Sequence, residues 1–118
     1  MPSKWWSIVV DCRDPAAVAD FWAAVLDYQV VYSAPDEVVL AKDEHTHPGL
    51  VFGTAPEAKT VKNRLHIDLN PADQQAEVER LLKLGARRID IGQGDVSWVV
   101  LADPEGNEFC VLRARDQT

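Results

Sequence analysis

The sequence has few cysteines, no long apolar run and no signal peptide pattern, and each of these absences excludes a class of protein. Cys12 and Cys110 are its two cysteines and form no C-x-x-C pair, so we expect reduced thiols rather than a disulfide framework. No apolar run approaches the roughly eighteen residues of a membrane span, and the N-terminus lacks the order of a secretory signal. These features predict a soluble, cytoplasmic protein that does not act in a membrane.

The sequence also has fewer basic than acidic residues. Twelve Lys and Arg against 19 Asp and Glu give a formal net charge of −7. The basic residues are scattered, whereas binding to nucleic acid needs a concentrated basic face. We therefore expect no nucleic-acid partner. The acidity favours solubility but does not identify a ligand.

The first half of the chain predicts a strand, a helix and three further strands. The whole chain of 118 residues, 47% hydrophobic and 26% charged, fits one globular domain with a core that is stable without disulfide bonds. Asp14-Pro15 is a helix start, since Asp can cap the first turn and Pro has the backbone angle of the first helical position. Apolar residues at Val18, Phe21, Trp22 and Val25 then form one helical stripe, while the predicted strands are residues 5–11, 28–33, 38–41 and 50–52.

The second half repeats this order. In the stretch 65–70, Leu65, Ile67 and Leu69 alternate with three polar residues, which predicts a strand with one apolar face and one polar face. A helix follows and stops at Gly85, and the predicted strands after it are residues 87–91, 97–102 and 108–112.

The two halves have the same spacing. Ser7 stands seven residues before Asp14, and His66 stands seven before Asp73, so the halves are offset by 66 − 7 = 59 residues. We predict one domain, residues 1–118, made of two modules, 1–58 and 59–118. Residues 55–62 are the expected connection, and we interpret Lys59, Lys62 and Arg64 as part of a solvated linker.

Several motifs together resemble the vicinal oxygen chelate superfamily, and more closely its glyoxalase-like, bleomycin-resistance-like branch. They are the Asp14-Pro15 helix start, Leu65-His66-Ile67-Asp68-Leu69 and the turn Asp103-Pro104-Glu105-Gly106-Asn107. The resemblance covers nearly the whole chain. It implies an α+β fold of two βαβββ modules that form a curved, eight-stranded, U-shaped cleft, often completed by a homodimer. Members include lyases, epimerases, dioxygenases, thiol transferases and drug-binding proteins without catalytic activity.

The resemblance also implies where a metal would be bound. Metal-dependent members take ligands from the first and last strand of each module. His66 falls on such a position, but Ser7 stands where a His is expected, and Leu50-Val51-Phe52-Gly53 offers no ligand. Cys110 replaces an expected carboxylate, with Glu108 two residues earlier on the same face. A catalytic site needs about three protein ligands, so we expect no cofactor, and a divalent metal held by His66, Cys110 and Glu108 is an alternative.

The polar face around His66 is the predicted site. His66 either contacts a ligand or transfers a proton, oriented by Asp68 or Glu108. Cys110 is read as a small buried residue rather than a nucleophile. Trp98, Phe52 and Trp5 are candidates for an aromatic floor. His45 and His47 are interpreted as exposed loop residues. The predicted catalytic residues are His66 and Glu108, and the predicted substrate-binding residues are Ser7, Phe52, His66, Asp68, Trp98, Glu108 and Cys110.

Three functions follow from this pattern. The leading hypothesis is a homodimeric protein that binds a small aromatic or hydrophobic molecule in its cleft without a catalytic metal. The second is a cofactor-free isomerase or lyase that uses His66 as general acid or base. The third is a metal-dependent lyase or dioxygenase with atypical ligands. A fold alone cannot choose among reactions, so the pattern does not decide whether the protein is an enzyme.

Overall fold

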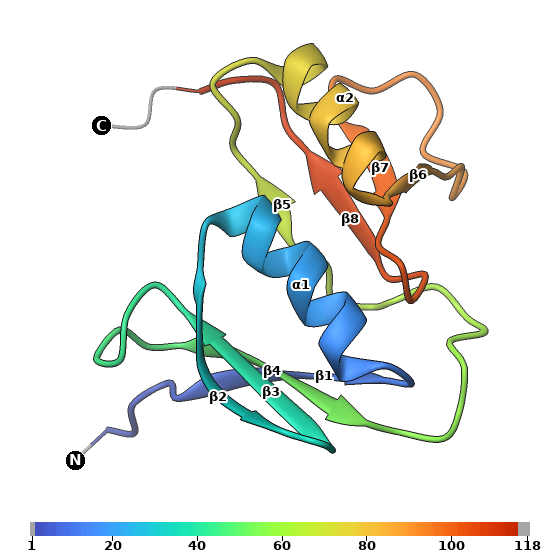
Figure 1. The fold of residues 1–118 in the computed structure, drawn as a ribbon. Helices are drawn as coiled ribbons and strands as arrows, with labels where there is room; N and C mark the ends of the chain where they lie inside the picture. Colours follow the sequence, from blue (N-terminus) through green and yellow to red (C-terminus); the bar gives the residue numbers. More distant parts are fainter. Residues whose placement is uncertain (1, 116–118) are drawn as a thin grey trace. The chain divides into compact units, whose positions relative to one another are not determined.

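The computed structural model describes residues 2–115 and consists of two compact units, one ending at Ala58 and the other beginning at Lys59. Each unit has the order strand, helix and three strands, so the expected α+β fold is confirmed (Figure 1). Unit 1 contains β1 (Ser7–Cys12), α1 (Pro15–Leu26), β2 (Gln29–Ala34), β3 (Glu37–Ala41) and β4 (Gly49–Thr54); unit 2 contains β5 (Asp68–Leu69), α2 (Gln74–Leu84), β6 (Arg87–Arg88), β7 (Val99–Ala102) and β8 (Glu108–Val111).

The two sheets have the same topology. In unit 1 the strand order is β1-β4-β3-β2, and in unit 2 it is β5-β8-β7-β6. The first strand of each unit runs parallel to the last, and the other pairs are antiparallel. The helix after the first strand provides the crossover that a parallel pair requires.

The helix starts confirm the repeated spacing. The Asp14 carboxylate accepts a hydrogen bond from the Ala17 amide at 3.2 Å, and the Asp73 carboxylate accepts one from the Ala76 amide at 3.1 Å. These caps are 73 − 14 = 59 residues apart and satisfy amides that a helix start leaves without a partner. The residue that caps the C-terminus of α2 is Gly85, whose positive φ of 116° suits glycine.

The core of unit 1 lies between α1 and one face of its sheet. The α1 side chains Val18, Phe21 and Trp22 are buried, as the helical stripe predicts. On β3 and β4, Leu40 and Phe52 are at most 1% exposed. Because side chains alternate across a strand, the residues between them point to the opposite face of the sheet.

In unit 2 the core is formed by α2 and the sheet strands β7 and β8. Val78 and Leu81 of the helix are buried, as are Leu101, Phe109 and Val111 of the strands. Leu82, which follows Leu81 in the same helix, is only half-buried.

Two predicted strands of unit 2 are shorter than expected. The strand predicted at 65–70 is reduced to Asp68–Leu69, and Leu65 is 88% exposed, so its assignment to a buried face was wrong. The Asn63 amide donates to the Glu108 carboxylate instead of joining a strand ladder, which holds the chain before β5 in an irregular path. His66 therefore lies just outside the strand.

The strand predicted at 87–91 ends at Arg88. The Ile91 amide donates to the Gln93 side chain at 2.8 Å, and the Gly92 amide donates to the Asp90 carboxylate at 2.7 Å. These local hydrogen bonds compete with sheet pairing and form a turn where the sequence predicted a longer strand.

The turn between β7 and β8 depends on Asp103, which is 2% exposed. Its carboxylate accepts hydrogen bonds from the amides of Glu105 and Asn107, both at 2.9 Å. Gly106 has a φ of 90°, a region that L side chains rarely adopt. The Asp-Pro-Glu-Gly-Asn sequence thus sets the start of β8, the strand that carries Glu108 and Cys110.

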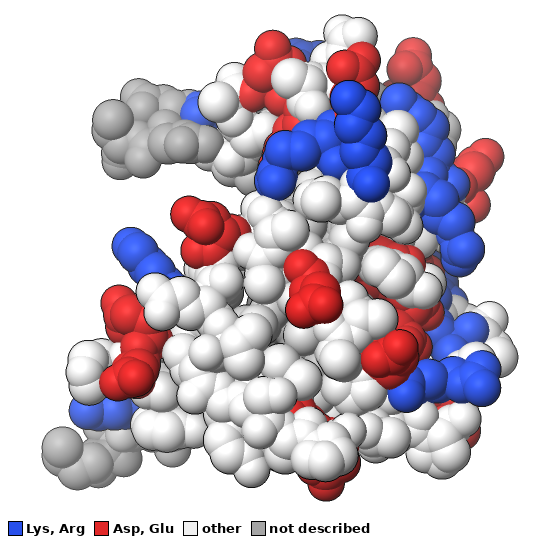
Figure 2. Space-filling view, in the orientation of Figure 1, with Lys and Arg blue, Asp and Glu red and all other residues white. Residues whose placement is uncertain are grey.

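Charged side chains of both signs share the surface of the described chain. Figure 2 shows acidic side chains among the basic ones on the face in view. Within residues 2–115, neither α1 nor α2 has the length and apolar character needed to cross a bilayer.

We predict that Gly106→Ala lowers the free energy of unfolding by about 1 to 2 kcal/mol, because a Cβ is strained at positive φ. Urea denaturation measures the change. Gly53→Ala is the matched control, since Gly53 has no positive φ and its added Cβ would meet no atom within 4 Å. Equal losses in both variants would contradict the role of the Gly106 conformation.

Candidate functional site

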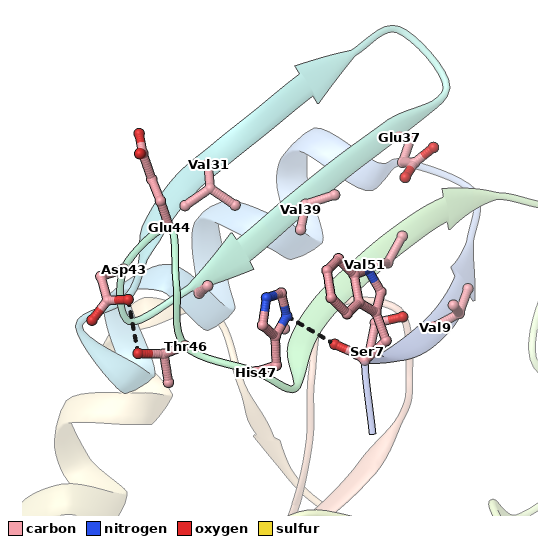
Figure 3. Close-up of a pocket in the computed structure, with 13 residues that line it drawn as sticks. Ser7, Val9, Val31, Glu37, Val39, Asp43, Glu44, Thr46, His47 and Val51 are labelled. Atoms are coloured by element: carbon pink, nitrogen blue, oxygen red, sulfur yellow. Dashed lines mark hydrogen bonds between the residues drawn. The ribbon is translucent and has the colours of Figure 1, made fainter. Parts of the chain in front are cut away.

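A pocket of about 290 Å³ lies on the face of the unit 1 sheet that α1 does not cover (Figure 3). Its floor and walls include Val9 of β1, Val39 of β3 and Val51 of β4. Val9 and Val51 are direct register partners, and Val39 is paired with Val51 on the other side. The strand alternation that buries Leu40 and Phe52 against the helix therefore exposes these valines to the pocket.

A β-bulge adds a fourth valine. The pairing of β2 with β3 shifts between Val30 and Tyr32, which leaves Val31 without a register partner. Val31 lines the pocket, and Figure 3 shows its side chain beside the β3 strand. Bulges commonly redirect side chains near binding sites.

Trp6 and His47 form an aromatic wall of the pocket. Their rings stack with centroids 4.0 Å apart and an interplanar angle of 19°. His47 Nδ1 lies 3.3 Å from the Trp6 carbonyl oxygen, and the Gly49 amide donates to the same oxygen at 3.1 Å. These contacts hold the loop after β3 against the start of β1. They give a loop histidine and an exposed tryptophan defined positions at the pocket.

The polar lining of the pocket is acidic. Glu37, Asp43 and Glu44 line it, and none of its described lining residues is Lys or Arg. Hydrogen bonds from the Thr46 hydroxyl and the His45 amide lower the pKa of Asp43, so this carboxylate is charged at neutral pH. Such a lining favours neutral or cationic groups over anions.

Unit 2 brings together a second set of groups: His66, Asp68 and Cys110. His66 Nδ1 lies 3.1 Å from Asp68 Oδ1, and one possible ligand atom from each of the three residues falls within 4.8 Å of the others. Asp68 and Cys110 are register partners in the parallel pair β5 and β8. The His66 and Asp68 side chains are 41% and 48% exposed, whereas Cys110 is buried.

Burial raises the pKa of the Cys110 thiol, and the negative charge of Asp68 raises it further. The thiol is therefore protonated at neutral pH, and the protonated form of a thiol is not the nucleophilic one. The imidazole beside Asp68 has the arrangement of an oriented acid or base.

Glu108 has a different role from the one predicted. Its side chain is 6% exposed and accepts hydrogen bonds from Lys59 Nζ at 2.9 Å and from the Asn63 amide at 3.2 Å. Burial favours the neutral acid, but the hydrogen bonds outweigh it and lower the pKa of Glu108. Glu108 thus anchors the segment before His66 instead of orienting its ring. Lys59, expected in a solvated linker, supplies the ion pair.

The predicted substrate-binding residues are divided between different environments. Ser7 lines the unit 1 pocket. Phe52 is 1% exposed on the helix side of β4, so its assignment to a ligand wall was wrong. Trp98 precedes β7 of unit 2 and is 40% exposed, and Trp5 is 64% exposed beside the pocket residue Trp6.

Sequence reasoning missed Trp6 and His47 as pocket residues. The sequence offered two signals: the position of Trp6 just before β1, and the H-x-H pattern of His45 and His47 in the loop between β3 and β4. Neither signal shows that a loop ring stacks on a tryptophan 41 residues away, which depends on where β4 returns beside β1.

Comparison with known proteins identifies the family. The model of the glyoxalase-like domain matches residues 7–112. The chain belongs to the glyoxalase-like domain family. None of the curated proteins compared with the chain matches it.

Solved structures share the fold at low sequence identity. A glyoxalase/bleomycin resistance protein/dioxygenase family enzyme from Burkholderia phytofirmans PsJN has a TM-score of 0.70 and 20% identity, with coverage of 92% of this chain and 97% of that chain. A possible glyoxalase from Bacillus cereus has a TM-score of 0.69 and 12% identity, covering 94% and 99%. The fosfomycin resistance protein FosX from Listeria monocytogenes, in complex with Mn(II) and a dihydroxypropylphosphonic acid, has a TM-score of 0.70 and 14% identity, covering 98% and 93%.

The residues of this glyoxalase-like chain do not fit the four-position metal set implied by the superfamily resemblance. Ser7 offers only a hydroxyl at the first position. Val51 of β4 occupies the place in unit 1 that Cys110 occupies in unit 2, and its side chain has no donor atom. His66 and Cys110 alone fall short of the roughly three protein ligands of a catalytic site.

We predict that Glu108→Gln lowers the free energy of unfolding at pH 7 by about 1 to 3 kcal/mol, because a neutral amide cannot form an ion pair with Lys59. The folded-state pKa of Glu108 lies below its ordinary value of 4.5, so this stabilisation is present above that value and is lost as pH falls through the folded-state pKa. Urea denaturation should show the two proteins converging in acid. Glu79→Gln, on the exposed face of α2, is the control and should leave the stability unchanged. If Glu108→Gln were as stable as wild type at pH 7, Glu108 would not stabilise the fold through Lys59.

Proposed function

We propose that this glyoxalase-like protein binds a small molecule with an aromatic or hydrophobic body in the unit 1 pocket, and that this binding requires no catalytic metal. The supporting observation is the pocket itself, about 290 Å³ with four valines and the stacked pair Trp6 and His47. This volume is near the lower end of the roughly 300 to 1,000 Å³ typical of ligand pockets. Affinity would come from apolar burial, with polar groups at the rim for orientation.

The acidic rim narrows the class of ligand. Glu37, Asp43 and Glu44 line the pocket without a basic lining residue to balance them in the described chain. An anionic ligand would be repelled, and a neutral ligand or one with an amine would be favoured. We therefore propose a compact aromatic ligand that is neutral or carries one positive charge.

The proposal predicts that an aromatic amine binds more tightly than the carboxylate of the same ring. Isothermal titration calorimetry with naphthylmethylamine, naphthylmethanol and naphthoate as probes measures the order. We expect the amine and the alcohol to bind and the carboxylate to bind at least about tenfold more weakly, a difference near 1.4 kcal/mol. Tighter binding of the carboxylate would contradict the role of the rim.

Two neighbouring tryptophans provide the matched variants for the same titrations. Trp6→Ala removes the ring that stacks on His47 and should weaken the probes by about tenfold or more. Trp5→Ala removes an equally exposed ring, 64% against 67%, that does not line the pocket, and should leave the affinity unchanged. Equal affinities for both variants would place the bound probe elsewhere.

We also propose that the protein is a homodimer. Val30 and Tyr32 on the edge strand β2 are 50% and 54% exposed, so this edge of the unit 1 sheet presents apolar side chains. Light scattering coupled to gel filtration should give twice the chain mass of 13.1 kDa. Tyr32→Arg should shift the mass toward the monomer if β2 contributes to the contact, and a wild-type monomer at micromolar concentration would refute the dimer.

A cytoplasmic location is proposed on the state of the thiols. Cys12 and Cys110 are both buried and are not joined in a disulfide. Proteins of reducing compartments keep their thiols in this state.

A further inference from the structure

We propose that unit 2 binds a zinc ion through His66, Asp68 and Cys110. One possible ligand atom from each of these residues lies within 4.8 Å of the others, and no other such group of three occurs among residues 2–115. The site lies in unit 2 and does not depend on the ligand proposed for the unit 1 pocket.

The fold places these groups together by strand pairing. Asp68 is directly opposite Cys110 in the parallel pair of β5 and β8. The Cys110 amide donates to the Ile67 carbonyl at 3.0 Å, so the backbone contact with β8 continues toward His66, ahead of the first residue of β5. His66 lies two residues before Asp68, and its Nδ1 already contacts the Asp68 carboxylate at 3.1 Å. Two backbone contacts and one side-chain contact therefore bring the three groups into the same small region.

The donor atoms are those that zinc prefers. One imidazole nitrogen, one carboxylate oxygen and one thiolate sulfur form a mixed set of borderline and soft ligands. Magnesium, calcium and manganese favour oxygen donors and would gain little from Cys110. The thiol must lose its proton to bind, and the ion supplies the positive charge that the buried sulfur lacks.

Access and geometry allow the ion to enter. Cys110 is 5% exposed at the base of the group, while His66 and Asp68 are exposed at its mouth. Zinc ligand bonds of about 2.0 to 2.3 Å bring donor atoms to roughly 3 to 4 Å from one another. The donor atoms, which lie within 4.8 Å of one another, therefore have to approach by at most about 1 Å, which rotation of the two exposed side chains can supply. Three protein ligands leave one coordination position open.

This set differs from the one that the superfamily resemblance implies. That set draws on both modules, whereas all three groups here belong to one unit, and Asp68 is not at one of its four positions. It also differs from the sequence-based alternative, in which Glu108 was the third ligand. Glu108 is engaged with Lys59 and the Asn63 amide, and Asp68 takes its place.

Titration of metal-free, full-length protein with Co²⁺ and Zn²⁺ tests the site. We expect one equivalent of Co²⁺ to produce a near-ultraviolet charge-transfer band from the thiolate, and one equivalent of Zn²⁺ to abolish it. Zn²⁺ should also raise the melting temperature, since it binds the folded chain. These readouts require no knowledge of an activity.

Three variants separate a site from incidental binding. Cys110→Ser should eliminate the charge-transfer band, and Asp68→Asn, at an exposed position, should weaken Zn²⁺ at least about tenfold. Cys12→Ser is the matched control, because Cys12 is also buried at 2% exposure but is outside the group. It should retain both the band and the affinity.

The proposal is overturned if wild-type protein shows no thiolate band, or if Asp68→Asn binds Zn²⁺ as tightly as wild type. A band lost in Cys12→Ser but retained in Cys110→Ser would also overturn it. Circular dichroism of the metal-free variants shows whether Cys110→Ser folds; if it does not, the Asp68→Asn comparison and the Cys12→Ser control decide the outcome.

Discussion

The alternation of side chains across each sheet is the constraint on which both candidate sites depend. In unit 1, Leu40 and Phe52 are buried against α1, and their neighbours in the same strands therefore face the pocket. In unit 2, Phe109 and Val111 are buried, and Cys110 between them points to the other face. A shift of one residue in either register would exchange the core for the site. The hydrophobic core and the chemistry are thus set by the same pairing of strands.

The two units have the same arrangement of strands, with different side chains at the equivalent positions. Val9 and Val51 are register partners in unit 1, and 59 residues later Asp68 and Cys110 are register partners in unit 2. Ser7 corresponds in the same way to His66. The equivalent face is therefore lined with valine in one unit and with ionisable groups in the other. The backbone tolerates both because neither set contributes to the packing against a helix.

The sequence was sufficient to predict the order of elements, the helix caps and the repeat, since these depend on local patterns. It also placed His66 and Asp68 on the polar side of the chain and Cys110 on the last strand. It could not predict that β5 would be two residues long or that Glu108 would bind Lys59. The first depends on the contact of Asn63 with Glu108, 45 positions apart, and the second on residues 49 positions apart. Phe52 was misassigned because a short apolar strand such as 50–52 does not reveal which face is buried.

The anchor formed by Glu108 accounts for the difference between the predicted and observed environment of His66. Had residues 63–66 continued the ladder with β8, their backbone would be fixed by strand hydrogen bonds. Instead the Asn63 amide is bound by the Glu108 carboxylate, and the Asn63 side chain donates to Asn107 at 3.0 Å. The chain is thus held firmly at Asn63 and again at β5, with His66 between them at 41% side-chain exposure. Because this short segment is fixed at both ends, the imidazole stays beside the Asp68 carboxylate even though no strand ladder holds its backbone.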